Sequence, residues 1–225
     1  MELVKVGKTK DVYKMENGDY LLKFKDSVTG HAPGVSDPGG NKVVGEVAGV
    51  GSATLKMSIY YFELFKKLNI PTHYVSADIS KNEMVVRPAV PFGKGLEFVV
   101  RYKAAGGFVR RFGLYCKEGD VLPGVLEVTL KDDERDDPPV TKEILAVLNL
   151  LTPAQYDELY AETIKICDLI RDDLKKHGLD LIDIKIEFAW VDGKIALIDE
   201  IGPGNMRVYQ DGKKLDYITL SNLVK

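Results

Sequence analysis

The chain has 225 residues, 45% of them hydrophobic and 29% charged, with a formal net charge of −3 at pH 7. This length and apolar content suffice for one large domain or two smaller lobes around a buried core. The balance of charges excludes the strongly positive surface of a typical nucleic-acid-binding protein, and the absence of any long apolar run excludes a membrane-spanning helix.

Strand-like sequence dominates the beginning of the chain. Val12 to Met15 and Tyr20 to Phe24 flank Asn17-Gly18, a dipeptide typical of two-residue hairpin turns, so an antiparallel hairpin is predicted here. Just before it, Gly7-Lys8-Thr9-Lys10 combines a glycine with two lysines. Such a turn either covers nucleotide phosphates, with close backbone approach and positive charge, or is an ordinary basic turn.

Turn-forming residues are concentrated from His31 to Gly40. They predict a loop within residues 31–50, which is either a mobile segment that closes over a ligand or a disordered insertion. A helix is predicted from Ser52 to about Leu68, because its large apolar residues recur at helical spacing.

Two more strands are predicted next, at residues 83–90 and 95–101. Pro88 and Pro91 lie between them and mark the expected connection between a first lobe, residues 1–90, and a second lobe, residues 91–225.

The segment from Arg101 to Arg111 concentrates positive charge around small residues. Arginine presents a planar fork to phosphate or carboxylate, and glycine lets the backbone approach closely, so this segment predicts an anion pocket; a solvated basic start of a helix would have the same composition. The densely charged run from Leu130 to Pro138 is expected to be a solvated surface, and its prolines are incompatible with a continuing helix.

A long helix is predicted from Thr152 to about His177. Thr152 and Gln155 form a capping-box pair, Pro153 occupies the first helical position and Gly178 ends the helix. Cys167 lies on its apolar stripe and is expected to be a packed hydrophobic residue. Cys116 and Cys167 form neither a metal-binding spacing nor a disulfide framework, and the N-terminus has no signal-peptide pattern. Together these two observations predict a cytoplasmic protein.

The C-terminal part carries the most informative pattern. Residues 181–190 and 194–201 are runs of strand-forming residues around Asp192-Gly193, which predicts a second hairpin. The charged side chains on one face of its first strand are Asp183, Lys185 and Glu187. Asp199 and Glu200 follow the second strand and are expected to come alongside Glu187.

A strand flanked by so many aliphatic residues should be buried, where charged groups are costly unless they are paired or bind a metal ion. The predicted cluster of carboxylates with one lysine suits Mg²⁺ together with a nucleotide. The alternative is a solvated edge hairpin with ordinary cross-strand pairs of lysine and glutamate.

Taken in order, these motifs resemble the SAICAR synthetase family, the ATP-dependent ligases that make phosphoribosylaminoimidazole-succinocarboxamide in purine biosynthesis. The resemblance spans most of the chain and rests on residues 7–10, 24–26, 70–73, 99–101 with 104–106, 131–138, 183–188, and 199–200 leading to Arg207. It implies an α+β, two-lobed fold related to ATP-grasp and kinase-like architectures. ATP would lie between a β-rich nucleotide-binding lobe and an α/β lobe that completes the ATP, Mg²⁺ and acid-substrate sites.

The family's chemistry is phosphorylation of a substrate carboxylate by ATP, followed by attack of the L-aspartate amine on the acyl phosphate. By resemblance, Glu187 and Asp199 would hold Mg²⁺. The remaining implied roles are ATP binding by Lys8, Lys10 and Lys185, contact of Arg101, Gly107 and Arg207 with the ribonucleotide phosphate, and a place near the reacting groups for Lys131, Asp137 and Lys185.

The chain departs from the family pattern where the ribonucleotide is expected. Gly107 replaces a serine, and Gly202-Pro203-Gly204 replaces Ser-Pro-Asp. Three alternatives therefore stay open beside the purine ligase: a related carboxylate-amine ligase for another acid, a small-molecule kinase, and a nucleotide-binding protein without ligase activity. The expected partners are ATP, L-aspartate and an imidazole ribonucleotide or related acid, without nucleic acid or membrane. A homodimer is one of the assemblies that the sequence leaves open.

Overall fold

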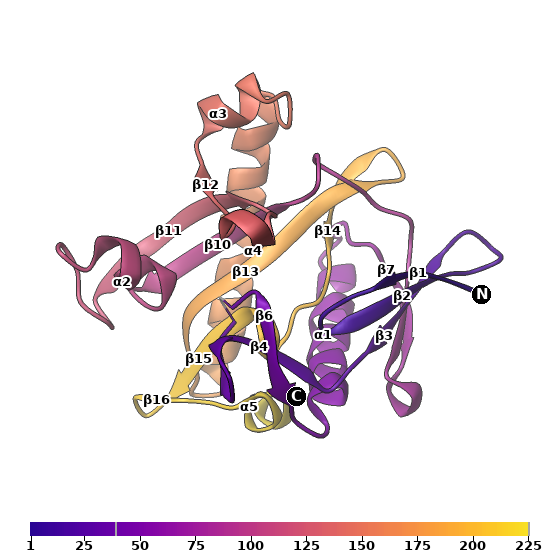
Figure 1. Cartoon of the computed structure of the whole chain (residues 1–225), viewed down its shortest axis with the longest axis horizontal. Helices are drawn as coiled ribbons and strands as arrows, with labels where there is room; N and C mark the ends of the chain where they lie inside the picture. The colour runs from indigo at the N-terminus through magenta and orange to yellow at the C-terminus, as the bar shows by residue number, and fades with distance from the viewer. Residues whose placement is uncertain (39, 225) are drawn as a thin grey trace. The chain divides into compact units, whose positions relative to one another are not determined.

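The computed structural model describes residues 1–38 and 40–224. The fold is α+β and divides into two compact units (Figure 1). Unit 1 consists of Met1–Val90, Ala189–Asn205 and Asp216–Lys225, and unit 2 of Pro91–Phe188 and Met206–Leu215. No helix in the described part of the chain is long and apolar enough to cross a membrane.

Unit 1 contains an antiparallel five-stranded sheet in the order β1-β2-β3-β8-β7. Its strands are β1 (Glu2–Val6), β2 (Lys10–Lys14), β3 (Tyr20–Phe24), β7 (Tyr74–Asp78) and β8 (Glu83–Val86). β2 and β3 pair with Lys14 opposite Tyr20 next to the turn and Lys10 opposite Phe24 at the far end. Gly18 in the turn between them has φ 93°. The hairpin predicted around Asn17-Gly18 is therefore confirmed.

Helix α1 (Val50–Lys67) packs against β3 in unit 1, as Figure 1 shows. Its N-terminus is capped by Asp26, whose Oδ2 accepts a hydrogen bond from Gly49 N at 3.0 Å and whose Oδ1 accepts one from Gly51 N at 2.9 Å. Such bonds satisfy amide groups that have no partner within the helix. The helix predicted from Ser52 to about Leu68 is confirmed.

The loop predicted within residues 31–50 is wrong for about half of its length. The chain there forms a three-stranded sheet in the order β5-β4-β6, from β4 (Ser27–Ala32), β5 (Val35–Ser36) and β6 (Lys42–Glu46). Gly30 and Gly40 lie so close that a Cβ atom on Gly40 would collide with the backbone of Gly30. The glycines that suggested a loop thus allow short strands to pack, while Gly39 lies outside the described residues.

The other elements of unit 1 complete its core. They are η1 (Ile79–Lys81), β14 (Lys194–Ile198), η3 (Pro203–Asn205) and α5 (Tyr217–Leu223). α5 packs against α1, and Phe62 and Phe65 of α1 are fully buried.

Unit 2 is built on an antiparallel sheet in the order β12-β11-β10-β13-β15-β16. Its strands are β10 (Leu96–Lys103), β11 (Val121–Leu130), β12 (Pro139–Val140), β13 (Asp180–Val191), β15 (Met206–Gln210) and β16 (Lys213–Lys214). The short β9 (Val90–Pro91) precedes them. β13 also pairs with β14 across Asp192 and Gly193, whose φ angles of 50° and 75° are those of a tight hairpin turn, so the second predicted hairpin is confirmed.

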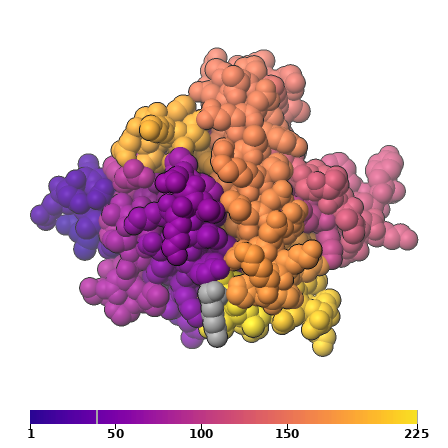
Figure 2. Space-filling view, turned by 180° about the vertical axis from the view of Figure 1, so that it is seen from behind, coloured from indigo at the N-terminus to yellow at the C-terminus, as the bar shows by residue number. Residues whose placement is uncertain are grey.

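Helix α4 (Pro153–Lys176) packs on β10 and β11. Both bonds of the predicted capping box between Thr152 and Gln155 are present, so this helix is confirmed as well. Its outer side carries exposed charged residues such as Lys165 and lies at the surface in Figure 2, where α4 is orange. The remaining helices of unit 2 are α2 (Gly107–Phe112), η2 (Asp133–Arg135) and α3 (Lys142–Val147).

The two cysteines have different surroundings. Cys167 on α4 is completely buried, and burial raises the pKa of its thiol well above the usual range, as expected for a packed hydrophobic residue. Cys116 is partly exposed just after α2, where its Sγ lies 3.4 Å from the carbonyl oxygen of Phe112.

Candidate active site

A row of charged side chains lies along β13 in the middle of the unit 2 sheet. Asp183, Lys185 and Glu187 share one face, while the alternate residues Ile184 and Ile186 are buried in the core. Asp183 and Glu187 are themselves only 2% and 5% exposed. The solvated edge hairpin considered from the sequence is therefore wrong, because β13 is a central strand and its carboxylates are buried.

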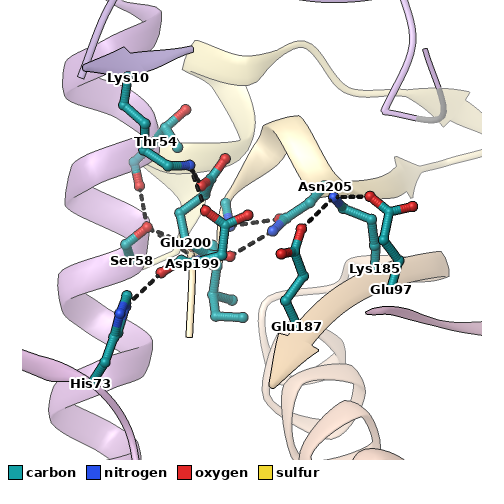
Figure 3. A network of polar contacts seen from close by, with 12 residues as sticks. Lys10, Thr54, Ser58, His73, Glu97, Lys185, Glu187, Asp199, Glu200 and Asn205 are labelled. Carbon is teal, nitrogen blue, oxygen red and sulfur yellow. Dashed lines mark hydrogen bonds and ion pairs between the residues drawn. The ribbon is translucent and has the colours of Figure 1, made fainter. Parts of the chain in front are cut away.

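Two lysines hold the Glu187 carboxylate. Lys131 Nζ donates to Glu187 Oε1 and Oε2 at 2.7 and 2.8 Å, and Lys185 Nζ donates to Oε1 at 2.9 Å. Lys185 also donates to Glu97 Oε1 at 2.7 Å, as Figure 3 shows. Glu97 lies directly opposite Glu187 on β10, so Lys185 compensates two neighbouring carboxylates.

Two arginines share the Asp183 carboxylate. Arg101 on β10 and Arg207 on β15 flank Asp183 in the sheet, and their Nη1 atoms lie 2.7 and 2.6 Å from Asp183 Oδ2. Arg101 Nε also donates to Glu127 Oε2 at 2.5 Å. Their side chains are 8% exposed, so both guanidinium groups are held in fixed positions by buried acids.

The predicted anion segment forms the turn from β10 into α2. Gly106 adopts φ 54° and ψ −122°, a backbone conformation that favours glycine. Gly107 begins α2, and the guanidinium groups of Arg110 and Arg111 lie close to it. The structure thus brings Arg101, Gly107 and Arg207 into one region of unit 2.

Unit 1 contains a second polar cluster, around Lys10 on β2. Its Nζ lies 2.7 Å from Asp199 Oδ1 and also forms an ion pair with Glu200 (Figure 3). Lys10 and Glu200 are largely buried, with 14% and 9% of their side chains exposed. Asp199 has φ 67°, a left-handed conformation that aspartate and asparagine tolerate better than most residues.

The segment from Asp199 to Asn205 is held by residues of its own unit. His73 Nε2 donates to the Asp199 carbonyl oxygen at 3.0 Å, because a carbonyl only accepts. Ser58 on α1 bonds both the N–H and the C=O of Ile201 at 3.2 Å, and Asn205 Oδ1 accepts from Gly202 N at 2.9 Å. Burial lowers the pKa of His73 to about 4, so its imidazole is neutral near pH 7.

The turn between β1 and β2 contains Lys8 and is fixed by Lys25. Lys25 Nζ donates to Gly7 O at 2.5 Å and to Asp11 Oδ1 at 2.9 Å, and its N–H donates to Thr9 O at 2.9 Å. Lys8 is exposed in this turn. The turn is therefore ordered while it presents a lysine to solvent.

Asp137 lies in the charged loop that follows β11. Its Oδ1 accepts a hydrogen bond from Asp132 N at 2.7 Å, and its own N–H donates to Asp132 O at 3.1 Å. Its φ of 45° shows that the chain turns sharply here. Asp137 and Lys131 belong to the same connection between β11 and β12.

Carboxylates are the candidate ligands for a metal ion. No group of three or more His, Cys, Asp or Glu side chains among residues 1–38 and 40–224 is arranged as a metal site. Mg²⁺ often takes only one or two protein carboxylates and completes its shell with phosphate oxygens and water. Glu187 in unit 2 and Asp199 in unit 1 are oxygen donors of this kind, and each is compensated by lysine ammonium groups in its own cluster.

Several residues of these clusters were missed in the sequence. Glu97 and Glu127 interrupt otherwise apolar strands, which was the available signal, but their partners depend on pairing across β10, β11 and β13. Asn205 gave no signal, and His73 entered only as the last residue of the 70–73 motif, without a role. Both side chains bond backbone groups of the 199–205 segment.

The family model of SAICAR synthetase matches residues 3–218. The chain belongs to the SAICAR synthetase family. Among the relatives, phosphoribosylaminoimidazole-succinocarboxamide synthase of Clostridium tetani (strain Massachusetts / E88) is 50% identical over 226 residues, covering 100% of this chain and 99% of the relative. The enzyme of the same name from Finegoldia magna (strain ATCC 29328 / DSM 20472 / WAL 2508) is 35% identical, covering 96% and 90%.

Solved structures of SAICAR synthetases have the same fold. One described as "SAICAR synthetase (Type-2) in complex with ADP" has a TM-score of 0.84 and 26% identity, covering 98% of this chain and 94% of that chain. The Pyrococcus horikoshii OT3 enzyme has a TM-score of 0.81 and 25% identity, covering 94% and 93%. The α+β, SAICAR synthetase-like fold expected from the sequence is therefore confirmed, and so is the family resemblance.

Proposed function

We propose that the chain is an ATP-dependent ligase that joins L-aspartate to carboxyaminoimidazole ribonucleotide and forms SAICAR in purine biosynthesis. The observation that carries this proposal is the 50% identity, over the whole chain, to the Clostridium tetani phosphoribosylaminoimidazole-succinocarboxamide synthase. The buried clusters of lysines, arginines and carboxylates in both units provide the charged groups that such a reaction requires.

The reaction has two steps. A carboxylate oxygen of the ribonucleotide attacks the γ-phosphorus of ATP, the bond to ADP breaks and an acyl phosphate forms. The amine of L-aspartate then attacks the acyl carbon, the C–O bond to phosphate breaks and the amine loses a proton, leaving an amide. The protein must neutralise charge on the moving phosphoryl group and hold the amine close to the acyl carbon.

Lys8, Lys10 and Lys185 bind ATP in this proposal, since an ammonium group is a compact point charge for phosphate oxygens. The related SAICAR synthetase in complex with ADP supports nucleotide binding. Glu187 and Asp199 would hold Mg²⁺ with the nucleotide, and this ion would supply positive charge to the phosphate oxygens. Lys10 and Lys185, which hold these carboxylates in the structure, are two of the lysines that bind ATP in this proposal.

Arg101 and Arg207, with the backbone at Gly107, bind the ribonucleotide phosphate. Both guanidinium groups are oriented by Asp183, so they are fixed before substrate arrives. Lys131 and Asp137 lie near the reacting groups, together with Lys185. A cytoplasmic location and a homodimer complete the proposal, and light scattering of the purified protein tests the assembly.

The decisive experiment is a reaction of the purified chain with Mg-ATP, L-aspartate and carboxyaminoimidazole ribonucleotide. ADP release is followed, the product mass is determined, and each substrate is omitted in turn. We expect turnover that needs all three substrates and yields the mass of the succinocarboxamide. ADP release with a different acid, with no succinocarboxamide from this ribonucleotide, would instead assign the chain to another carboxylate-amine ligase.

A further inference from the structure

The segment that carries Asp199 and Glu200 departs from the strand before it. β14 ends at Ile198, and the carboxylates of the next two residues both reach the ammonium group of Lys10. Neighbouring side chains of an extended strand point to opposite sides, so a regular continuation of β14 would separate these two acids. The φ of 67° at Asp199 breaks the alternation. A left-handed residue of this kind persists only where its surroundings determine the backbone.

Three buried side chains of unit 1 bond the backbone of this segment (Figure 3), and we call them the clamp: Ser58, His73 and Asn205. His73, 4% exposed, donates from Nε2 to the carbonyl oxygen of Asp199 at 3.0 Å. Asn205 is also 4% exposed. Its Nδ2 donates to the Glu200 carbonyl oxygen at 2.5 Å, and its Oδ1 accepts from Gly202 N at 2.9 Å. The carboxamide thus fixes the turn from both ends.

Ser58 ties the residue between those ends, Ile201, to helix α1. Its Oγ accepts a hydrogen bond from Ile201 N at 3.2 Å. The single hydroxyl proton is shared between Thr54 O at 2.8 Å and Ile201 O at 3.2 Å. Ser58 and Ile201 are both fully buried, so water does not replace these bonds. Side chains therefore bond successive backbone groups here, in place of the strand pairing that holds β14.

We propose that the clamp residues Ser58, His73 and Asn205 are positioning residues, which set the backbone conformation that turns Asp199 and Glu200 toward Lys10 together. The inference rests on the proposed function, in which Asp199 would hold Mg²⁺ and Lys10 would bind ATP. The clamp touches no substrate in this role. It acts through the two acids by fixing them before the nucleotide arrives, which lowers the entropic cost of binding.

Loss of one clamp bond has a defined consequence at Lys10. A buried backbone group without its partner costs free energy, so the segment moves to satisfy that group. The two carboxylates then hold Lys10 less well, because a more regular strand geometry turns one of them away. A side chain that only filled space in the core would lower stability without this change at Lys10.

The first test replaces Ser58 by Ala, which removes the hydroxyl and changes the volume little. The matched control is Ser221→Ala on α5. Ser221 is 1% exposed in the same unit, and its Oγ has no hydrogen-bond partner in the part of the chain that the structure describes. We expect Ser58→Ala to lower kcat/KM for Mg-ATP about tenfold and to change the KM for the ribonucleotide less than about twofold. Ser221→Ala should change neither value by more than about twofold.

Thermal unfolding shows that both serine variants are folded under the assay conditions. A similar loss of kcat/KM in both variants, or no loss in Ser58→Ala, would overturn the inference. So would an equal rise in the KM for the ribonucleotide and in the KM for Mg-ATP.

His73 allows a comparison of donors. His73→Gln keeps an N–H donor for the Asp199 carbonyl oxygen, whereas His73→Leu has no donor. We expect His73→Gln to retain at least about a third of the wild-type kcat/KM for Mg-ATP, and His73→Leu to fall about tenfold. Equal values in the two variants would show that this hydrogen bond does not position Asp199, and would overturn the inference for His73.

Acetylation of the ligand-free protein detects the position of the acids without nucleotide or metal. Trace acetic anhydride modifies a buried, ion-paired amine slowly, and peptide masses give the rate at each lysine. Lys10 is 14% exposed, and the internal reference is Lys25, which is 29% exposed in the same unit and paired with Asp11. We expect Ser58→Ala to raise the rate at Lys10 at least about threefold relative to Lys25, and Ser221→Ala to leave the ratio unchanged.

This labelling separates the clamp from the proposed function. If the wild-type protein makes no succinocarboxamide but Lys10 becomes more reactive in Ser58→Ala alone, the ligase activity fails and the clamp stands. If the wild-type protein makes succinocarboxamide and the ratio of Lys10 to Lys25 is the same in Ser58→Ala, the ligase activity stands and the clamp is overturned.

Discussion

Glu187 and Asp199 are the two side chains whose charge matters most to the proposed reaction. Replacement of Glu187 by Gln or of Asp199 by Asn preserves size but removes the negative charge that would hold Mg²⁺. We expect each variant to lose turnover by at least about 100-fold, since a bound metal ion contributes several kcal/mol to such transition states. Steady-state ADP release measures the loss.

The matched control is Glu158→Gln, an exposed carboxylate on α4, which should keep normal turnover. Thermal unfolding of each variant shows whether the fold is retained, because lysines that lose a partner cost some stability. Near-normal turnover of Glu187→Gln or Asp199→Asn in a folded protein would remove that residue from the metal site.

His73 gives a prediction about stability and pH. Its folded-state pKa is about 4 against 6.5 unfolded, so the unfolded state takes up a proton first as the pH falls. The contribution of neutral His73 to the free energy of unfolding is fully present above pH 6.5. It decreases between pH 6.5 and 4, by roughly 3 kcal/mol at 1.36 kcal/mol per pKa unit. Urea unfolding of the ligand-free protein across this range measures the loss.

In His73→Gln the imidazole is gone while an N–H donor for the Asp199 carbonyl is retained. This variant should lose clearly less stability than the wild type between pH 6.5 and 4. His31→Gln, at an exposed position, is the control and should follow the wild type. Identical pH dependence in the wild type and His73→Gln would show that protonation of His73 does not limit stability.

At the scale of elements, the segment from Asp199 to Asn205 packs closely against helix α1 at Gly202. A Cβ atom at Gly202 would lie 2.9 Å from Thr54 Cγ2 and 3.3 Å from Thr54 O, whereas one at Gly204 meets its nearest neighbour, Tyr217 Cε1, at an ordinary 3.5 Å. We expect Gly202→Ala to cost about 1–3 kcal/mol and to lower kcat/KM, because the segment must shift. Gly204→Ala is the matched control and should stay close to the wild type.

Urea unfolding and steady-state kinetics of the two alanine variants check this prediction. Equal stability and activity in both would mean that the segment adjusts to Gly202→Ala without displacing Asp199. Gly202 is also one of the positions where the chain departs from the family pattern, and the observed packing against Thr54 leaves no space there for a side chain.

Local signals in the sequence were reliable where one element determines its own geometry. Asn17-Gly18 and Asp192-Gly193 set hairpin turns through their backbone conformations, and Thr152 and Gln155 cap α4 with bonds inside one turn. The loop prediction for the region after His31 failed for a physical reason. Glycine signals a turn on its own, whereas here Gly30 lies within β4 and Gly40, just before β6, packs directly against its backbone.

At the scale of the whole molecule, unit 1 is not complete at Val90. The chain continues into unit 2 and returns to unit 1 with residues 189–205 and again from Asp216. Residues 189–205 supply Leu197, which is fully buried and whose N–H donates to Pro71 O at 3.0 Å. They also supply Ile201, equally buried and bonded to Ser58. A fragment of residues 1–90 lacks these contacts.

We therefore expect the isolated 1–90 fragment to show no cooperative unfolding transition, because its exposed apolar surface and unpaired backbone groups leave too little net stability. Circular dichroism in increasing urea, with the full chain as the control, measures this. A cooperative transition in the fragment would show that the first ninety residues form a core without the later segments.

The polar clusters illustrate the limit of sequence reasoning at this scale. The row on β13 was predictable from alternation along one strand, since Asp183, Lys185 and Glu187 must share a face. The partners of Asp183 were not predictable in this way. Arg101 and Arg207 lie opposite Asp183 only because strands from distant parts of the chain pair in particular registers. Only the folded sheet fixes which acid meets which base.

The unequal surroundings of Cys116 and Cys167 offer a practical use. A maleimide dye must reach the sulfur that it modifies. Cys167 is completely buried and its thiol pKa is raised, whereas Cys116 is partly exposed. The unmodified chain can therefore be labelled at a single position, four residues beyond the end of α2 at Phe112. Fluorescence from that label would report events at this helix without an engineered cysteine.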